Sequence, residues 1–577
     1  MLKRLIVHEL FTKQCPYRLE HFTVQEDTSS FQLCRLTFLV SLQLKLNINS
    51  TTLFVIGMYK YLARSFPDFG SRGIVVGYDT RAQEASGCNS ERLARLTAAV
   101  MLCKDIPVFL FSTYVPTPFV PYAVKRLGAA AGVMVTASHN PKEDNGYKVY
   151  WHNGAQISSP NDKEILKCIE ESSEPWSESW NESLADNSPL RSDPLREISK
   201  MYMEDLSSVC FHRELNTKSP LKFVHSSFHG VGHDYVQQAF RAFGFPPPIP
   251  VPEQKDPDPN FSTVSCPNPE EGESVLELSL RLAERENATI VMATDPDADR
   301  LAVAEQSDSE NSVCRWKVFT GNELAALLGW WMLFNWKETH PDPADRERMY
   351  MLATTVSSKI LKAFARKEGF HFEETLPGFK WIGKKIHELE SIGFLCGSMV
   401  PDKDGVSAAV VVAEMASYLY NKNLTLHQQL ENIFETYGYH ISTTSYVICY
   451  DPPTVKRIFT RLRNFEGENT YPRSSGGHSI VDVRDVTTGY DSSQPDKLCV
   501  LPMTKSSQMI TFTLQNGIVA TLRTSGTEPK IKFYTEFCAP PGKSDISSLE
   551  EELKKVTDTL VEEFLEPDKN NLIRRSI

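Results

Sequence analysis

Short apolar runs that stop abruptly at polar residues recur along this chain and constrain its fold most strongly. Residues 73–78 read Gly-Ile-Val-Val-Gly-Tyr and stop at Asp79, and residues 108–111 read Val-Phe-Leu-Phe and precede Pro116. Continuous runs of this length are typical of strands buried on both faces, which occur in sheets covered by helices. The sequence therefore predicts α/β domains whose ligands lie at the carboxyl ends of the strands.

The C-terminal part has a different pattern. Residues 509–515 and 518–524 read as strands joined by Asn516-Gly517, a dipeptide typical of tight hairpins because both residues accept positive φ. Ser547 and Glu550 have the spacing of a capping box at the start of a following helix. That helix has one apolar stripe, formed by Leu549, Leu553, Val556, Leu560 and Phe564. We expect three α/β units and a smaller α+β unit, since 577 residues suit about four domains.

The composition indicates a cytoplasmic enzyme. The net charge is 61 − 73 = −12 and no basic run is present, which argues against a nucleic-acid partner. The 12 cysteines are scattered without a Cys-x-x-Cys pair, which favours a reducing compartment. Arg35 and Lys45 interrupt the apolar residues 31–48, so we expect neither a membrane span nor a membrane partner.

Ser138 is the first candidate for chemistry. It lies in Thr-Ala-Ser-His-Asn-Pro, residues 136–141, directly after the apolar residues 129–135. A serine hydroxyl becomes a useful nucleophile when a base or a metal assists it. Lys148 follows within ten residues, so a cation can fold back over the same loop. The alternative is an ordinary loop serine.

Asp295, Asp297 and Asp299 form the second candidate site, directly after the apolar residues 288–294. Alternate spacing puts three carboxylates on one side of an extended loop, and hard oxygen ligands of this kind suit Mg²⁺. A calcium-binding EF-hand is excluded because Arg300 and Gln306 occupy the positions of its glycine and glutamate. A solvated acidic turn remains the alternative. Taken with Ser138, the aspartates predict phosphoryl transfer through a serine, assisted by a divalent cation.

The third candidate is a phosphate clamp at residues 523–530, which read Arg-Thr-Ser-Gly-Thr-Glu-Pro-Lys. Arg523 offers a planar fork to phosphate oxygens. Ser525, Thr527 and the backbone N–H groups around Gly526 could complete an anion-binding nest.

Two other patterns resemble known sites without matching them. Residues 378–384 resemble a P-loop, but Lys385 replaces the required Ser or Thr and no apolar strand precedes them. His225, His229 and His233 recur every four residues, but Gly230 and Gly232 disfavour the helix that a zinc site would need. We expect neither a nucleotide site nor a zinc site there.

With these three constellations in this order, the chain resembles the α-D-phosphohexomutase superfamily from about Met58 to the C-terminus. It is similar to the phosphoglucomutase-2 branch, and residues 253–259, 329–332 and 375–381 carry the likeness to its glucose 1,6-bisphosphate-forming members. The resemblance implies three α/β/α domains with mixed sheets and a C-terminal α+β domain like the TATA-binding protein. The implied division is an atypical segment 1–57, domain 1 at 58–205 with the phosphoserine, domain 2 at 206–312 with the metal loop, domain 3 at 313–428 with the sugar-orienting loop, and the phosphate-clamp domain at 429–577.

The resemblance also implies residue roles. Ser138 would carry the phosphoryl group and, with the three aspartates, would hold Mg²⁺. His139, Lys148 and Arg300 would join Ser138 as catalytic residues, with Lys148 as the proton shuttle. The substrate would be held by Gly378, Phe379, Lys380, Glu390, Ser391, Arg523, Ser525, Gly526, Thr527 and Lys530.

The implied activity is synthesis of glucose 1,6-bisphosphate from glucose 1-phosphate by a monomer, with 1,3-bisphosphoglycerate as donor. A phosphoglucomutase or phosphopentomutase is the alternative. Two departures allow a third possibility, an impaired protein that only binds sugar phosphates. Residues 1–57 lack the family's Phe-Gly-Thr-Ala-Gly-Leu-Arg-type segment, and domain 3 lacks a strand. Within that second departure, Leu389 stands where the family has the first glutamate of Glu-Glu-Ser.

Overall fold

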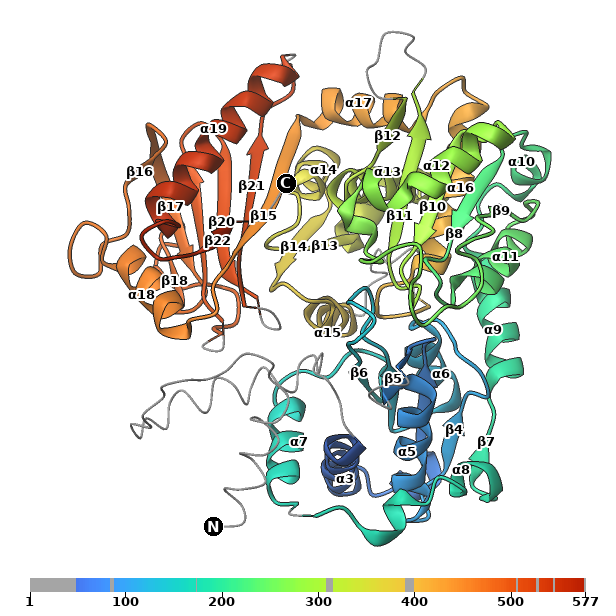
Figure 1. Ribbon diagram of the computed structural model, residues 1–577. Helices are drawn as coiled ribbons and strands as arrows, with labels where there is room; N and C mark the ends of the chain where they lie inside the picture. Colours follow the sequence, from blue (N-terminus) through green and yellow to red (C-terminus); the bar gives the residue numbers. More distant parts are fainter. Residues whose placement is uncertain are drawn as a thin grey trace.

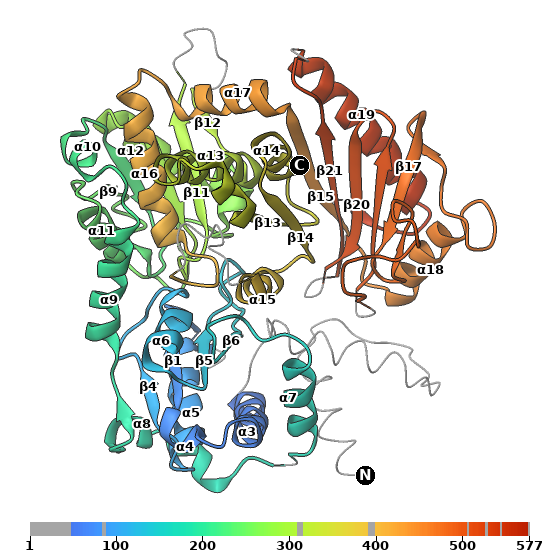
Figure 2. The same cartoon turned by 180° about the vertical axis from the view of Figure 1, so that it is seen from behind.

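Four units follow one another along the chain in an arc, from blue through green and yellow to red (Figure 1). The computed structural model describes residues 48–83, 88–172, 174–307, 315–389, 399–504, 507–525, 529–542 and 545–574. Seen from the front and from behind (Figure 2), helix α15 (Phe379–Leu389) lies between the third unit's sheet and the first unit. Among the described residues, no helix is both long enough and apolar enough to cross a membrane.

The first unit is a mixed five-stranded sheet of order β6-β5-β1-β4-β7. Strand β6 is antiparallel to β5, and the other pairings are parallel. Val75 packs with the core on the α6 side, whereas Ile74 and Val76 pack with α5 on the opposite side, so β1 is buried on both faces as its apolar run predicted. The elements are β1 (Ile74–Tyr78), β4 (Val108–Leu110), β5 (Ala131–Val135), β6 (Tyr147–Trp151), β7 (Arg191–Ser192), α5 (Ser90–Leu102), α6 (Phe119–Leu127) and α7 (Asn161–Glu170).

Helix α3 (Ile48–Ser65) also belongs to this unit, because it packs against α5 and α7. The boundary expected at residue 58 therefore falls inside a packed helix. Short elements complete the unit and its connection to the next: α4 (Phe69–Arg72), β2 (Ala82–Gln83), β3 (Cys88–Asn89), a 3₁₀ helix (Ser177–Trp180), α8 (Leu184–Asn187), α9 (Leu195–Ser208) and α10 (Arg213–Lys218).

The second unit is a mixed sheet of order β12-β11-β10-β8-β9. Helix α12 covers one face, and α11 together with α16 covers the other. Helix α16 comes from the third unit's part of the chain, so the two units share one core. The elements are β8 (Phe223–Ser226), α11 (Gly232–Ala242), β9 (Ile249–Pro250), a 3₁₀ helix (Pro269–Glu271), α12 (Glu273–Glu286), β10 (Ile290–Thr294), β11 (Leu301–Gln306), β12 (Trp316–Val318) and α16 (Gly405–Tyr420).

The third unit has a parallel pair of strands, β13 and β14, among the residues that the structure describes. The first two units have five strands each. The strand that the resemblance implies to be missing would fall around Leu389, which ends α15; residues 390–398 are not among those described. The elements are α13 (Gly321–Thr339), a 3₁₀ helix (Pro343–Arg348), β13 (Tyr350–Thr354), α14 (Ile360–Glu368), β14 (His371–Thr375) and α17 (Leu426–Tyr437).

The fourth unit is an antiparallel sheet of order β16-β17-β19-β20-β21-β15-β22, with β18 paired to β17. The predicted hairpin is present as β19 and β20, and Gly517 has a φ of +97°. The predicted apolar stripe is buried in α19, but the predicted capping box is wrong because Asp545 caps the helix by accepting from the Ser548 N–H. The elements are β15 (His440–Ile448), α18 (Pro452–Arg463), β16 (Ser474–Ser475), β17 (His478–Asp485), β18 (Tyr490–Asp491), β19 (Met509–Leu514), β20 (Ile518–Thr524), β21 (Lys530–Cys538), α19 (Ile546–Leu565) and β22 (Ile573–Arg574).

An ionic contact joins the third and fourth units. Glu374 in β14 accepts from Lys359 Nζ at 2.9 Å and from Arg484 Nη1 of β17 at 2.7 Å. Burial acts to raise the pKa of Glu374, but the two cations outweigh it and lower this pKa to about 2.

We expect this contact to stabilise the fold in a pH-dependent way. The pKa of Glu374 in the folded protein lies below its unfolded value of about 4.3. The contact therefore contributes its full stabilisation above the unfolded pKa, and this stabilisation is lost as the pH falls through the folded-state pKa. At neutral pH the contact should contribute on the order of 3 kcal/mol to the free energy of unfolding. Glu374→Gln should therefore lower the melting temperature strongly at pH 7 and less at pH 3.

The matched control is Glu373→Gln, which removes the half-exposed neighbouring pair of Glu373 with Lys385 at 2.8 Å. It should change the melting temperature little at either pH. If both variants lost the same melting temperature at pH 7 and at pH 3, the stabilising role of the Glu374 contact would be contradicted.

Candidate active site

Ser138 and the three aspartates meet at the ends of strands from two units. Ser138 follows β5, and the aspartates lie between β10 and β11. The Ser138 hydroxyl donates to Asp295 Oδ2 at 2.9 Å, across 157 positions of sequence. Ser138 is buried and has a φ of +54°. The two loops thus form one site at the carboxyl ends of the strands, where α/β sheets bind ligands.

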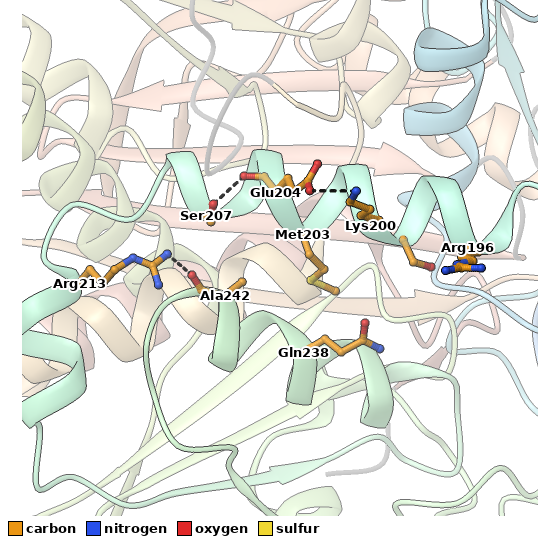
Figure 3. Close-up of a pocket in the computed structure, with 9 residues that line it drawn as sticks. Arg196, Lys200, Met203, Glu204, Ser207, Arg213, Gln238 and Ala242 are labelled. Atoms are coloured by element: carbon orange, nitrogen blue, oxygen red, sulfur yellow. Dashed lines mark hydrogen bonds and ion pairs between the residues drawn. The ribbon is translucent and has the colours of Figure 1, made fainter.

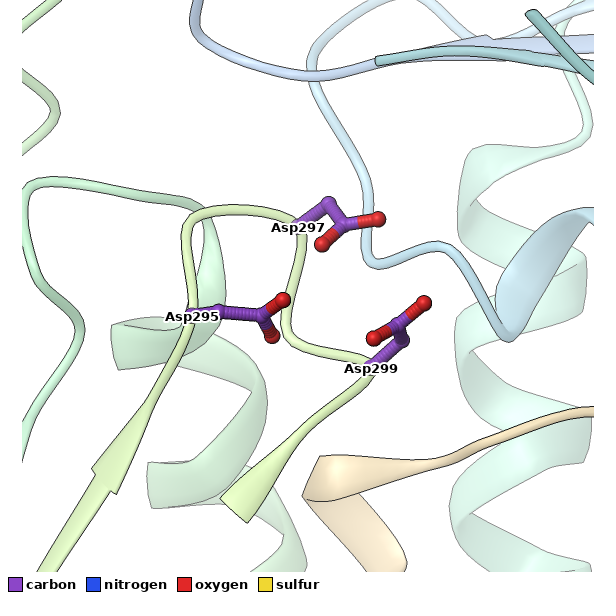
Figure 4. Close-up of side chains that lie close together, drawn as sticks. All are labelled: Asp295, Asp297 and Asp299. Atoms are coloured by element: carbon purple, nitrogen blue, oxygen red, sulfur yellow. The ribbon is translucent and has the colours of Figure 1, made fainter. Parts of the chain in front are cut away.

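The three carboxylates converge on one point (Figure 4). A ligand atom from each lies within 4.8 Å of those of the other two, and all three side chains are buried. Asp295 Oδ1 accepts from the Arg300 backbone N–H at 2.8 Å, which fixes the loop. Asp297 Oδ1 and Asp299 Oδ1 are buried and accept no hydrogen bond.

These two oxygens show that the site fits a divalent cation. A buried carboxylate oxygen without a partner is costly, and a bound cation would satisfy both at once. The all-oxygen ligand set is the type that hard divalent cations prefer. No second cluster of His, Cys, Asp and Glu with metal-ligand spacing occurs among the described residues. His225, His229 and His233 lie respectively on β8, in the following turn and on α11.

Three cations balance the three carboxylates. Lys148 Nζ lies 2.5 Å from both Asp297 Oδ2 and Asp299 Oδ2. Lys403 Nζ lies 2.5 Å from Asp299 Oδ2, and Arg300 Nε lies 3.9 Å from Asp299 Oδ1. The formal charges of this cluster therefore cancel. Adding a divalent cation and a doubly charged phosphoryl group would leave the sum unchanged.

Burial and neighbouring charges shift the pKa values of the residues in this site. Burial, followed by the charges of Asp297 and Asp299, raises the pKa of Asp295 well above its usual value. Burial acts to lower the pKa of Lys148, but the same two carboxylates outweigh it and raise that pKa. Burial, then Arg300 and other cations, lowers the pKa of His139 to about 2. His139 is therefore neutral, with Nδ1 3.4 Å from Ser138 Oγ.

Arg300 divides its contacts between this cluster and the second unit's surface. Its Nη1 donates to Glu270 Oε1 at 2.8 Å and to Asn268 Oδ1 at 3.2 Å. Its Nε lies 3.9 Å from Asp295 Oδ2. Arg300 thus borders the triad, whereas Lys148 touches it directly.

Sequence patterns did not single out two further residues of the cluster. Thr117 donates from Oγ1 to Asp297 Oδ2 at 2.5 Å, and its N–H donates to Asp297 O at 2.9 Å. Its position in Pro116-Thr117-Pro118 after β4 was the available signal, since polar residues at strand ends mark ligand sites. Lys403 follows Asp402, which accepts from Tyr150 OH of β6 at 2.7 Å. No local pattern distinguishes Lys403 from a surface lysine.

The predicted sugar-orienting residues lie at the start of α15. Gly378 has a φ of +115°, which glycine adopts without strain, and Phe379 begins the helix. Strand β14 does precede this turn, but it reads His-Phe-Glu-Glu-Thr and is not the apolar strand of a P-loop. Lys380 Nζ lies 5.6 Å from the Trp381 ring centroid. Glu390 and Ser391 fall outside the described residues.

The predicted phosphate clamp lies between β20 and β21. Arg523 pairs in register with Lys532 of β21, and Ser525 N–H donates to Lys530 O at 2.8 Å. Lys530 Nζ lies 4.1 Å from the Tyr446 ring centroid. These contacts bring two ends of the clamp together; Gly526 and Thr527 are outside the described residues.

A groove of about 610 Å³ lies elsewhere, along α9, α10 and α11 (Figure 3). Lys200 pairs with Glu204 at 3.7 Å on its rim. These three helices carry none of the predicted site residues, so the groove is separate from the candidate site. Its lining residues are Arg196, Ser199, Lys200, Met203, Glu204, Ser207, Arg213, Gln238 and Ala242.

Comparisons with known proteins find relatives along most of the chain. Residues 42–176, 200–308 and 320–437 match alpha/beta/alpha domains I, II and III of phosphoglucomutase/phosphomannomutase. The chain is 67% identical over 533 residues to glucose 1,6-bisphosphate synthase of Homo sapiens, covering 90% of this chain and 85% of that protein. It is 56% identical over 528 residues to phosphopentomutase of Mus musculus, covering 89% and 84%. The open form of pp63/parafusin, a phosphoglucomutase from Paramecium, shares the fold with a TM-score of 0.63 at 16% identity, covering 92% of this chain and 94% of that one.

We expect Asp297→Asn to weaken divalent-cation binding, because it removes one charge and changes an oxygen that has no other partner. The affinity for Mg²⁺ or Mn²⁺, measured by calorimetric titration, should fall about tenfold or more. Asp186→Asn is the control, since Asp186 forms a surface ion pair with Arg95. Unchanged affinity in Asp297→Asn would exclude this carboxylate as a ligand.

Proposed function

Because the chain belongs to the phosphoglucomutase/phosphomannomutase family, we propose that it makes glucose 1,6-bisphosphate from glucose 1-phosphate by Mg²⁺-dependent transfer through Ser138. The chain is an enzyme of the phosphohexomutase superfamily. The observation that carries the proposal is the 2.9 Å hydrogen bond from Ser138 Oγ to a carboxylate of the buried triad. Relatives at 67% identity, named glucose 1,6-bisphosphate synthase, support the product.

In this proposal the chain's residues position and neutralise the transferring group. Asp295, Asp297, Asp299 and Ser138 would hold Mg²⁺, whose charge when bound stabilises the phosphoryl oxygens. Ser138 Oγ receives the phosphoryl group from the donor and passes it to a sugar hydroxyl. Burial of the loop keeps water from competing with that hydroxyl.

Lys148 is the proposed proton shuttle. Its contacts with Asp297 and Asp299 favour the ammonium form, so it donates a proton to Ser138 Oγ when the phosphoryl group leaves that oxygen for the sugar. The resulting amine takes up the proton that the sugar hydroxyl loses, whereas the donor leaves as a carboxylate and needs no proton. Neutral His139 adds no charge beside Ser138 Oγ, and Arg300 adds a permanent one at the rim of the triad.

The sugar phosphate is held from the other two units. We assign the sugar hydroxyls to the start of α15 and to Glu390 and Ser391, and the non-reacting phosphate to residues 523–530. The donor proposed is 1,3-bisphosphoglycerate, and the enzyme is proposed to act as a cytoplasmic monomer. Seven described cysteines are free thiols, which supports a reducing compartment.

A mutase is the second candidate, because phosphopentomutases are 56% identical to the chain. An impaired sugar-phosphate-binding protein is the third, because Leu389 replaces a family glutamate. Two assays of the purified protein with Mg²⁺ separate them: glucose 1-phosphate with and without 1,3-bisphosphoglycerate, and glucose 1-phosphate or ribose 1-phosphate with a trace of sugar bisphosphate. A synthase accumulates bisphosphate with the donor, a mutase converts glucose 1-phosphate or ribose 1-phosphate given a trace of sugar bisphosphate, and an impaired protein does neither.

Ser138→Ala should abolish phosphoryl transfer while the melting temperature stays near that of the wild type. Removing the acceptor oxygen leaves no route, since this chemistry depends on positioning and charge neutralisation. Product formation and phosphoprotein mass should both be lost. Ser207→Ala, at a partly exposed serine of α9, should retain both. Normal turnover in Ser138→Ala would disprove the mechanism.

Arg523→Lys should raise the KM for glucose 1-phosphate and change kcat little. The variant keeps the charge but loses the bidentate fork, and a non-reacting phosphate is bound equally in the ground state and the transition state. Arg574→Lys, at an exposed ion pair with Glu562 in the same unit, is the control. A fall in kcat with KM unchanged would instead place Arg523 at the reacting phosphate.

A further inference from the structure

The loop that carries Ser138 is wrapped around one buried guanidinium. Arg81 follows β1 and has 1% of its surface exposed. Its Nε donates to Asp79 Oδ2 at 3.2 Å. Its two terminal nitrogens donate to four backbone carbonyls of the same loop: Ser138 O at 2.5 Å, Pro141 O at 2.7 Å, Asn140 O at 2.8 Å and Asp144 O at 3.1 Å. All five donors of the guanidinium are therefore in use.

A second chain of hydrogen bonds reaches Ser138 from its other side. Asp79 Oδ2 accepts from Thr136 Oγ1 at 2.6 Å. Thr136 Oγ1 in turn accepts from the Ser138 N–H at 2.8 Å. Asp79 Oδ1 accepts from Ser90 Oγ at 2.6 Å. Asp79 thus supports both Arg81, which holds the Ser138 carbonyl, and Thr136, which holds the Ser138 N–H.

Hydrogen bonds to both the carbonyl and the N–H of Ser138 explain how this residue keeps an unfavourable backbone conformation. A φ of +54° is left-handed, a region that is unfavourable for residues other than glycine. Such a conformation persists only where the surroundings fix it. In this conformation the hydroxyl reaches Asp295, 2.9 Å away, so the backbone hold sets the distance between the nucleophile and the triad.

We propose that Arg81 is a positioning residue for phosphoryl transfer: with Asp79 and Thr136 it fixes the Ser138 backbone so that Oγ faces the triad. This inference rests on the proposed role of Ser138. Arg81 itself touches the loop's carbonyls and not the reacting oxygen. Lysine keeps the charge but cannot supply five donors in one plane, so it cannot hold the loop in the same way.

The test measures the rate of Ser138 phosphorylation in a single turnover with labelled 1,3-bisphosphoglycerate and the full chain. Arg81→Lys should slow it about 100-fold, the loss expected when a reacting group is misplaced by about 1 Å. The dissociation constant of glucose 1-phosphate and the affinity of the aspartate triad for Mg²⁺ should stay near wild-type values, because the clamp and the triad are intact. A merely structural role would slow phosphorylation and also weaken the binding of both glucose 1-phosphate and Mg²⁺.

Two further comparisons keep the test decisive. Thr136→Val removes the hydrogen bond to the Ser138 N–H and should slow phosphorylation. Thr136→Ser keeps the hydroxyl and should react at the wild-type rate. These two variants test the proposal even if Arg81→Lys does not fold. Arg72→Lys is the matched control, since Arg72 also donates to backbone carbonyls, those of Gly128 and Ala129, in the same unit. It should react at the wild-type rate.

The outcomes separate this inference from the function on which it rests. Wild-type rates in Arg81→Lys and Thr136→Val, or an equal loss in Arg72→Lys, would overturn the positioning role alone. A wild-type protein that takes no label on Ser138 would overturn the proposed function and the inference with it.

Discussion

Neutralising three buried carboxylates is the constraint on which the rest of this structure depends. Charges that leave water must be paired, and an unpaired carboxylate in this setting would destabilise the fold or take up a proton. Asp295, Asp297 and Asp299 are balanced by Lys148, Lys403 and Arg300, but only the last of these cations lies on the same loop. The other two come from different units of the chain. The cluster therefore forms only when the first three units are assembled.

The packing between units reflects that requirement. Helix α16 covers the second unit's sheet although it follows the third unit's strands, so its first turn is held firmly beside the triad. Asp404 caps this helix and accepts from Tyr202 OH at 2.6 Å, while the neighbouring Asp402 accepts from the first unit. Lys403 lies between these two anchored residues. Its position near Asp299 is therefore set by the assembly and not by its own flexible side chain.

The sequence correctly predicted the parts of this structure that local patterns determine. Continuous apolar runs predicted β1 and β10, which pack on both faces, and Asn516-Gly517 predicted the hairpin between β19 and β20. It failed at the start of α19, where two nearby residues could each cap the helix and Asp545 does so in place of Ser547. It also missed Thr117 and Lys403, whose roles depend on contacts 180 and 104 positions away in sequence. Contacts between residues this far apart produce no periodic pattern in the sequence, so they cannot be predicted from a single chain.

The two halves of the proposed reaction differ in how the chain supports them. Phosphoryl transfer depends on residues buried in loops that share hydrogen bonds, so each position is fixed by several others. Sugar recognition is proposed to use the start of α15, beside a two-stranded sheet in the described part of the third unit. Selectivity between hydroxylated sugars comes from buried polar groups matched to each hydroxyl. A leucine at position 389, where the resemblance implies a glutamate, would remove one such group from the proposed site. A chain of this kind should therefore retain phosphoryl transfer more readily than it distinguishes a hexose phosphate from a pentose phosphate.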